Sequence, residues 1–203
     1  EGLTVARRLD DARAVLRAVI EGFGSRRSSE RADLHYSLAR VAEAASDIEE
    51  AFAELEQATK MDLSHQGALH MLARLARDQG DLDRAERAYR GLLLVVRRQR
   101  SEDVNALGPA EIFFDLYRIA LTRGQNEAAE ELLSSAFESA TQSEVDARRL
   151  SRVLRSHGEV ALLLRVLDAR LALARDPVDA DGSARGDRQG CESADDPLGR
   201  IWR

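Results

Sequence analysis

The sequence contains few of the residues that build disulfide-rich, β-rich or membrane-spanning proteins. Its 203 residues include one cysteine, Cys191, which excludes an internal disulfide and a cysteine metal cluster. There are 3 prolines, aromatic residues make up 4% of the chain, and β-branched residues are scarce. The longest apolar run, residues 91–96, is too short to cross a bilayer. The abundant Ala, Leu, Arg and Glu therefore predict a helical protein.

Lysine is almost absent as well. Lys60 is the only lysine among 30 basic residues, and arginine supplies the rest. The net charge of -6 gives no general attraction to nucleic acid or to an anionic membrane. The excess of Ala, Leu and Arg is typical of a GC-rich bacterial coding sequence. No signal peptide is visible, so we expect a cytoplasmic location. Because the chain begins at Glu1 without methionine, we leave open that it is part of a longer protein.

Apolar residues recur along the chain with a period of 34 residues. In the window that begins at Gln66, apolar residues occupy positions 4, 7, 8, 11, 20, 24 and 27. Three further windows largely repeat this pattern. They begin at Ala32, which is 34 residues earlier, at Ala110 and at Glu144. Position 15 of the four windows holds Ser46, Gly80, Gly124 and Gly158. Spacings of three and four residues on both sides of position 15 predict two amphipathic helices in each window.

A period of 34 with this pattern resembles the tetratricopeptide repeat, a pair of antiparallel helices. The resemblance implies an all-α, right-handed α-solenoid with repeats at 32–65, 66–99, 110–143 and 144–175. The residues themselves agree with it. Glycine at position 15 suits the left-handed conformation that ends a helix. Asp47 and Asp81 directly follow two of these turns, where a carboxylate caps the next helix.

The predicted array has irregular ends and one interruption. Residues 9–20 match residues 82–93, so we expect 1–21 to be the second helix of a partial repeat, followed by a loop at 22–31. Residues 100–109 are an insertion, and Pro109 is suited to start the next helix. Residues 176–203 have the composition of a disordered tail.

The segment 160–174 is apolar on more than one side of its expected helix. A terminal repeat usually presents a polar outer face. We therefore expect this helix to be covered by a further helix, by a second subunit or by missing chain.

In the family that the chain resembles, positions 2, 5, 9, 12 and 13 of each first helix line a concave groove that binds extended peptides. Position 9 is arginine in all four repeats here. A guanidinium group forms two parallel hydrogen bonds with a carboxylate, so an acidic peptide or a free C-terminus is the expected ligand. The predicted peptide-binding residues are Tyr36, Arg40, His70, Arg74, Arg77, Phe114, Arg118, Arg148, Arg152 and Arg155.

Two observations oppose this hypothesis. Arginine is common in the whole chain, and Glu43, Asp78 and Asp115 are placed to neutralise the groove arginines.

The carboxylate clamp that binds chaperone C-termini in this family uses lysine and asparagine. Tyr36, Ser37, Arg40 or Met71 stand in those slots, so binding of a chaperone tail is not expected.

No motif for catalysis or for a cofactor is present. The chain has no phosphate-binding loop and no nucleophile elbow, and its histidines lack metal-ligand spacing. His35 falls on a core position. We therefore expect a non-catalytic protein-interaction scaffold without a cofactor or a metal. The alternatives are self-association through 160–174, RNA binding as a weaker option, and an enzyme whose site the sequence does not reveal. Residues 25–31 fit a flexible insertion better than a docking loop.

Overall fold

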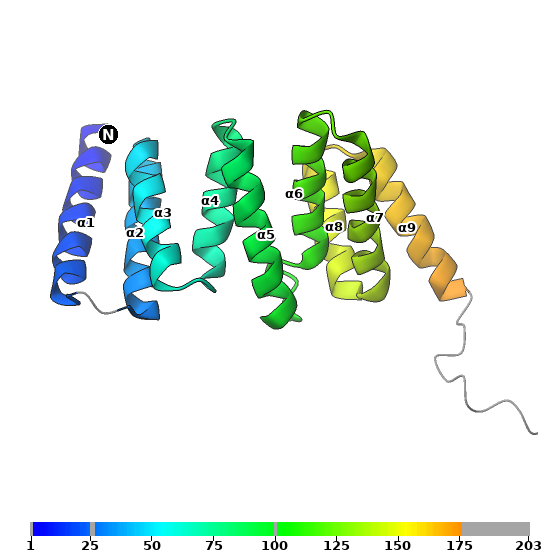
Figure 1. Ribbon diagram of the computed structural model, residues 1–203, viewed down its shortest axis with the longest axis horizontal. Helices are drawn as coiled ribbons and strands as arrows, with labels where there is room; N and C mark the ends of the chain where they lie inside the picture. The colour runs from blue at the N-terminus through cyan, green and yellow to red at the C-terminus, as the bar shows by residue number, and fades with distance from the viewer. Residues whose placement is uncertain (1, 25–26, 100, 176–203) are drawn as a thin grey trace, which may run out of the picture.

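The computed structural model describes residues 2–24, 27–99 and 101–175, and within these ranges the chain forms helices and no strand. The predicted all-α class is therefore confirmed (Figure 1). The expected tail at 176–203 lies outside the described residues, as do residues 25 and 26 of the expected loop. The helices are α1 (Gly2–Gly22), α2 (Ser29–Ala44), α3 (Ile48–Met61), α4 (Gln66–Asp78), α5 (Leu82–Gln99), α6 (Pro109–Thr122), α7 (Asn126–Gln142), α8 (Glu144–Ser156) and α9 (Val160–Arg175).

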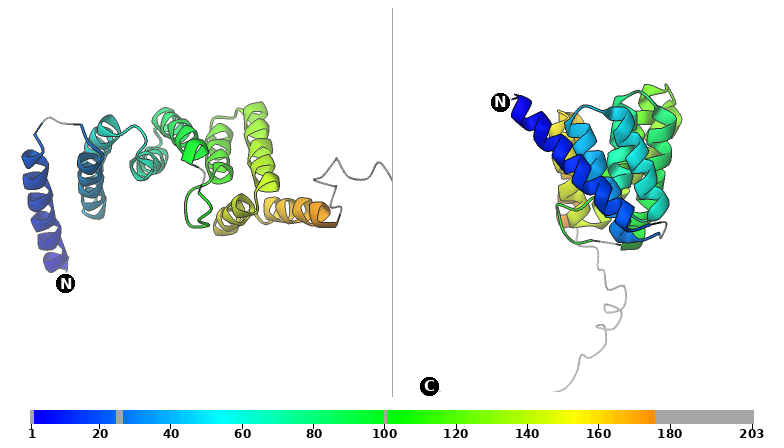
Figure 2. Two further views of the ribbon diagram at one scale, coloured as in Figure 1. Left: turned by 90° about the horizontal axis from the view of Figure 1, so that it is seen from below. Right: turned by 90° about the vertical axis from the view of Figure 1, so that its left-hand side faces the viewer.

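The helices stack in chain order into an elongated solenoid (Figures 1 and 2). The closest packing is within the pairs α2–α3, α4–α5 and α6–α7. Helix α6 also packs against α8, and α7 packs against α9. In Figure 1, α3, α5 and α7 lie in front of α2, α4 and α8. Helices α2, α4 and α8 are therefore best seen from behind, whereas α6 lies in front of α8 in this view.

The turns within the pairs have the conformation that the glycine pattern predicts. Ser46, Gly80, Gly124 and Gly158 have φ values of 62, 79, 70 and 72°. These values lie in the left-handed region, which glycine adopts without strain and a serine does not. After two of the turns, Asp47 accepts a hydrogen bond from the Glu50 amide at 3.2 Å, and Asp81 accepts one from the Arg84 amide at 3.0 Å. Both aspartates thus cap a second helix, as expected.

The core consists of two neighbouring clusters of apolar side chains. The first extends from α2 to α6 and includes the fully buried Leu55, Tyr89 and Leu92. The second joins α6 to α7, α8 and α9, and includes Phe114 and Leu150. Helix α6 contributes to both clusters and joins the two halves of the array. His35 is buried at its expected core position and contacts Glu54 at 2.6 Å.

The two end helices leave apolar surface open. On α9, Val166 is buried, while Val160, Leu164, Leu167 and Leu171 are exposed on another side. Helix α9 therefore has one buried and one exposed apolar side, and the expected cover over 160–174 stays a prediction. No helix of the described ranges has the length and apolar character needed to span a membrane.

The insertion between α5 and α6 folds back onto the molecule. Pro109 is the first residue of α6, as predicted, and the Gly108 amide donates to Glu111 Oε2 at 3.1 Å. In the left view of Figure 2, the segment that precedes Pro109 runs to the side of the array on which α8 lies. We call residues 101–108 the strap.

Candidate functional site

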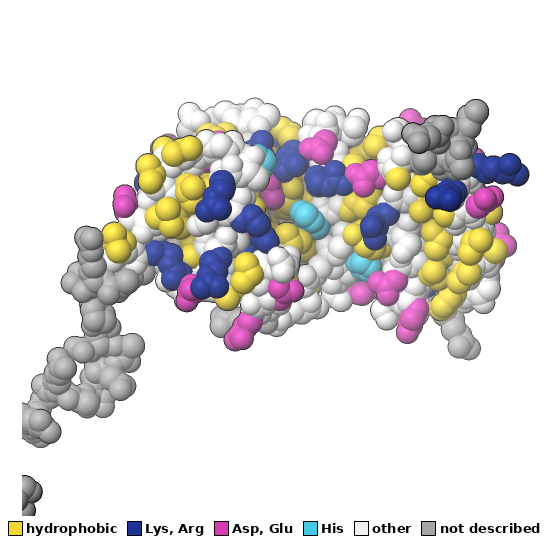
Figure 3. Space-filling model, turned by 180° about the vertical axis from the view of Figure 1, so that it is seen from behind, with side chains coloured by type: hydrophobic (Ala, Val, Ile, Leu, Met, Phe, Trp, Pro, Cys, Tyr) yellow, Lys and Arg dark blue, Asp and Glu magenta, His cyan; other side chains and the backbone are white. Residues whose placement is uncertain are grey.

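The predicted groove residues lie on the four first helices, α2, α4, α6 and α8. Spacings of three and four residues place the arginines of each helix on one face of that helix. Figure 3 shows the side of the molecule opposite to Figure 1. Basic side chains run along it with acidic side chains and histidines between them, and they gather toward the end that carries α8 and α9. Helix α2 carries Tyr36 and Arg40, α4 carries His70, Arg74 and Arg77, α6 carries Phe114 and Arg118, and α8 carries Arg148, Arg152 and Arg155.

Phe114 does not line this surface. Its side chain is 0% exposed and belongs to the second core cluster. The ring lies 5.7 Å from the Tyr117 ring and 5.9 Å from the His157 ring, measured between centroids. Helix α8 packs against α6 near Phe114 and covers this position, which the repeat numbering had assigned to the open groove. The prediction that Phe114 contacts a peptide was wrong, because burial of a large aromatic ring in the core is more favourable.

Tyr36 remains half-buried on the predicted surface. Its ring lies 5.0 Å from the His65 ring, and the Arg40 guanidinium lies 6.0 Å from the Tyr36 centroid. Gly67 on α4 makes room for the tyrosine, since a Cβ there would lie 3.0 Å from the Tyr36 ring. The α2 end of the surface therefore combines one aromatic ring with one exposed cation.

Acidic side chains on adjacent first helices neutralise much of the arginine row. Arg74 on α4 forms an ion pair with Glu43 on α2. Arg77 on α4 donates to Asp115 on α6 at 2.8 Å. Arg74 also contacts Asp78 at 3.7 Å within its own helix. The opposing hypothesis of neutralisation therefore holds for α4, and the pairs connect three successive first helices.

The Arg77–Asp115 pair lies against a buried tyrosine. Tyr89 is 0% exposed, and its hydroxyl lies 3.4 Å from Arg77 Nη1. Burial raises the pKa of Asp115 to about 6, although the nearby Arg77 and Arg118 act in the opposite direction. Burial is also the main reason why the pKa of Tyr89 lies above its ordinary value. This cluster is therefore a largely desolvated charged part of the candidate surface.

Two histidines border the row and are neutral at pH 7. Burial, with Arg74 and Arg77 nearby, holds the pKa of His70 below its ordinary value. Burial and the neighbouring Arg118 lower the pKa of His157 in the same way. The Arg118 guanidinium contacts the His157 ring at 3.1 Å. Neither histidine therefore adds positive charge to the surface.

Three predicted arginines form no ion pair with a carboxylate within the described ranges: Arg40, Arg118 and Arg155. The charge of Arg118 nevertheless acts on the nearby Asp115. Arg40 and Arg155 are exposed, and Arg118 is half-buried. Arg148 is exposed but forms an ion pair with Glu144 of its own helix. The cations available to an outside anion are therefore fewer than the seven predicted arginines suggest, and they lie on α2, α6 and α8.

Arg152 binds the strap. Its Nη2 donates to the Val104 carbonyl oxygen at 2.9 Å and to Glu111 Oε1 at 3.2 Å. Its Nη1 lies 3.4 Å from Asn105 Oδ1. Arg152 therefore joins α8, α6 and the strap.

A second strap-binding arginine, Arg149, was not among the predicted residues. It is 3% exposed, donates to Asp146 Oδ1 at 2.8 Å, and binds the carbonyl oxygens of Ser101, at 2.7 Å, and Asp103. Repeat numbering places Arg149 between groove and core positions, so the pattern assigned it no role. Arg149 lies 46 to 48 residues from the backbone oxygens that it binds, so the sequence carried no signal of this contact.

The described residues contain no cluster of His, Cys, Asp or Glu that could hold a metal ion. A cavity of about 660 Å³ lies beneath the strap, between the ends of α5 and α7 and the starts of α6 and α8. A second cavity of about 310 Å³ lies between α1 and α2 and is lined by Leu9, Leu16, Val41 and Arg40.

Comparison with known proteins identifies the repeats. The tetratricopeptide repeat model matches residues 32–65 and 67–94. No curated protein matches the chain in sequence. Among solved structures, MamA is 12% identical, with 83% of this chain and 92% of that chain covered and a TM-score of 0.52. BtubC (BKLC) from P. vanneervenii is 13% identical, with 94% and 82% covered and a TM-score of 0.54.

A putative kinesin light chain from Podosopora anserina, described as having nearly identical TPR-like repeats, is also similar. It is 18% identical, with 86% of this chain and 91% of that chain covered and a TM-score of 0.54. At these identities the likeness concerns the fold alone.

Tetratricopeptide repeats generally mediate protein–protein interaction. Residues 32–65 and 67–94 are tetratricopeptide repeats, and the described chain has the fold of a tetratricopeptide-repeat solenoid.

Proposed function

We propose that the chain is a non-catalytic, cytoplasmic scaffold that binds an extended acidic segment of a partner protein along its first helices. The main support is the set Arg40, Arg118 and Arg155, which occupy repeat positions 9 and 12 and form no ion pair with a carboxylate within the described ranges. A guanidinium group without such a partner gains charge-assisted hydrogen bonds when a carboxylate arrives. Arg74 and Arg77 gain less, because each already contacts a carboxylate.

The segment is expected to be extended because the available cations lie on different helices. One peptide must cross from α6 to α8 to reach both Arg118 and Arg155. An extended chain covers about 3.3 Å per residue and leaves its side chains free to reach either helix. This mode of recognition uses regularly placed side chains on a rigid surface rather than a deep pocket.

The test is a titration by fluorescence anisotropy. The probe is a labelled ten-residue peptide of alternating Glu and Ser, and the comparison peptide has Gln in place of Glu. We expect the Glu peptide to bind and the Gln peptide to bind at least tenfold more weakly, because only the first offers carboxylates. Binding should weaken as salt is added. The double variant Arg118→Ala/Arg155→Ala should lose about thirtyfold in affinity, since each substitution removes about 1 kcal/mol.

Arg87 on α5 provides the matched control, because it is an exposed arginine on a second helix. Arg87→Ala should leave the affinity unchanged. A loss of binding free energy in Arg87→Ala about half as large as in the double variant, which removes two charges, would show only a general response to net charge. Random single-stranded RNA as a competitor should not displace the Glu peptide. Displacement by RNA would favour the nucleic-acid alternative instead.

Self-association through α9 is a second candidate function. Val160, Leu164, Leu167 and Leu171 are exposed and follow one another at spacings of 4, 3 and 4 residues. These are the spacings of the apolar seam between two paired helices. A second copy of the chain supplies the same seam, so a two-fold pair of α9 helices buries both stripes in a self-complementary interface.

The mass of the protein in solution, measured by light scattering, tests this second candidate. A dimer at micromolar concentration is expected. Leu164→Glu/Leu167→Glu should convert it to a monomer with unchanged helix content, because a pair would bury the added carboxylates. A wild-type protein that stays monomeric at high concentration would rule out the pairing.

A further inference from the structure

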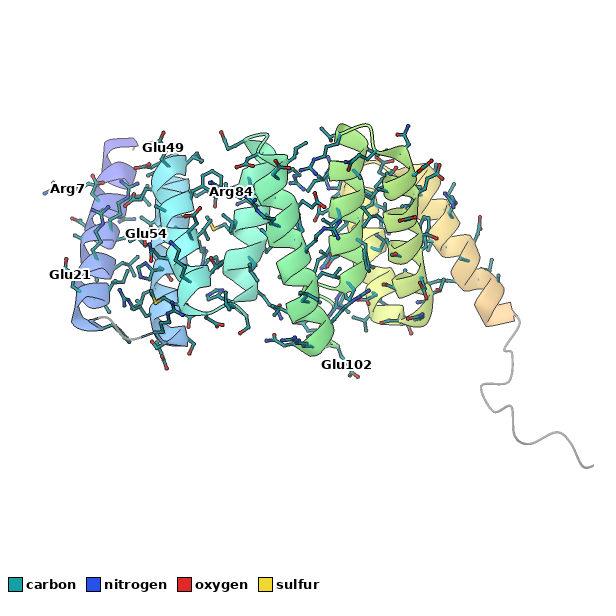
Figure 4. All side chains as sticks on the ribbon, viewed as in Figure 1. Arg7, Glu21, Glu49, Glu54, Arg84 and Glu102 are labelled. Carbon is teal, nitrogen blue, oxygen red and sulfur yellow. The ribbon has the colours of Figure 1, made fainter. Side chains whose placement is uncertain are left out.

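The strap lies against α8, where it contacts one of the predicted groove residues, Arg152. It offers main-chain carbonyl oxygens to arginines of α8: Ser101 and Asp103 to Arg149, and Val104 to Arg152. Its acidic side chain at Glu102 is exposed, and Figure 4 shows it at the edge of the molecule, pointing away from the helices. The strap is therefore bound to α8 through its backbone and not through its carboxylates.

Arg152 connects this contact to the proposed peptide surface. It occupies repeat position 9, as Arg40, Arg74 and Arg118 do in the other repeats. Both hydrogens of its Nη2 are directed to internal acceptors, the Val104 carbonyl and the Glu111 carboxylate. A partner segment can use Arg152 fully only by replacing one of these acceptors.

The strap has an internal turn and a close-fitting end. Asp103 Oδ1 accepts a hydrogen bond from the Asn105 amide at 2.9 Å, and the Asp103 carbonyl oxygen accepts one from the Ala106 amide at 3.0 Å. Gly108 lies so close to α8 that a Cβ would be 2.3 Å from Asp146 Oδ1. Such an ordered turn holds the strap carbonyls in position for Arg149 and Arg152.

We propose that the strap is an internal competitor that occupies the α8 part of the peptide surface and that a partner segment must displace from Arg152. This inference rests on the proposed peptide binding. The apparent affinity for a partner is then the intrinsic affinity reduced by the fraction of molecules in which the strap is displaced. Weakening the strap, without changing any arginine, increases partner binding.

The experiment compares Asp103→Ala with Glu102→Ala in the full chain. Both substitutions remove one carboxylate from the strap, so they change the repulsion of an acidic probe equally. Only Asp103→Ala removes the turn hydrogen bond to Asn105. With the alternating Glu–Ser peptide as probe, we expect Asp103→Ala to bind about fivefold more tightly than the wild type and than Glu102→Ala. Saturating probe should also speed hydrogen exchange at the Asn105 and Ala106 amides of the wild type.

Each other result has a distinct meaning. If the probe binds all three proteins equally and the strap amides keep their protection, the peptide surface exists but the strap does not compete. If Asp103→Ala speeds strap exchange without probe, yet the probe binds none of the proteins, both the proposed function and this inference are rejected. If the two variants bind equally but better than the wild type, the gain is electrostatic and the competitor is rejected.

Discussion

At the scale of single residues, the surroundings of each arginine determine what it can bind. Arg74 and Arg118 occupy the same repeat position, but only Arg74 has a carboxylate from the preceding first helix, Glu43. Sequence spacing predicted which helix face these residues share. It named Glu43 as an acidic residue that neutralises the groove, but it did not pair Glu43 with Arg74 or His157 with Arg118. These partners lie 31 and 39 residues away and depend on how neighbouring helices are placed. The same limit applies to Phe114. Sequence spacing placed it on the groove face, but α8 packs against α6 and buries its ring in the core.

Asp115 gives a prediction at this scale. Burial raises its pKa from 3.8 to about 6 in the folded protein. The folded state therefore binds the proton more tightly than the unfolded state, so this group's contribution to stability is fully present below about pH 4 and is lost as the pH rises through 6. The difference in Tm between the wild type and Asp115→Asn should therefore be more favourable to the wild type at pH 4 than at pH 7.

Thermal unfolding across this pH range is the measurement, with Asp168→Asn as the control. Asp168 is an exposed carboxylate on α9, far in sequence from Arg77. Its variant should follow the wild-type pH profile. A difference between wild type and Asp115→Asn that grows with rising pH would show that Arg77 lowers the pKa of Asp115 more than burial raises it.

At the scale of elements, the pairing of helices was predictable because turns have strict local requirements. Gly80, Gly124 and Gly158 fell at the same position of the period, and all have positive φ. Pro109 indicated the start of α6 in the same way. The path of the insertion could not be predicted. The strap is held by hydrogen bonds from Arg149 and Arg152 to backbone oxygens, and a backbone oxygen leaves no pattern in the sequence.

A reciprocal pair of substitutions tests the turn requirement. Ser46 holds a left-handed conformation that costs a residue with a Cβ roughly 1–2 kcal/mol, partly offset by the greater backbone entropy that glycine loses. Ser46→Gly should therefore stabilise the protein by up to about 1 kcal/mol. Gly80→Ser should destabilise it by about 1 kcal/mol from backbone strain alone, because a Cβ at Gly80 meets no atom within 4 Å. Urea unfolding midpoints give both values, and shifts in the same direction would contradict the shared role of the two turns.

At the scale of the whole molecule, the fold follows from repetition of one local pattern. The period of 34 residues predicted the all-α solenoid because each helix pair buries its apolar side against the next pair. The separation into two core clusters that meet at α6 was not predicted. The separation arises because α6 packs against helices on both of its sides, and the pattern of one repeat does not specify these contacts. The first-helix surface crosses this junction, from Arg40 on α2 to Arg155 on α8.

The central claim is that the arginines without carboxylate partners on the first helices bind an acidic segment. Its most direct test is an NMR spectrum of the arginine Nε–H groups, assigned with single Arg→Lys variants and recorded with and without the alternating Glu–Ser peptide. Our account predicts that the signals of Arg40, Arg118 and Arg155 shift on binding and that the signal of Arg87 does not. Shifts confined to Arg87 and other arginines of the second helices, or no shift at saturating peptide, would contradict it.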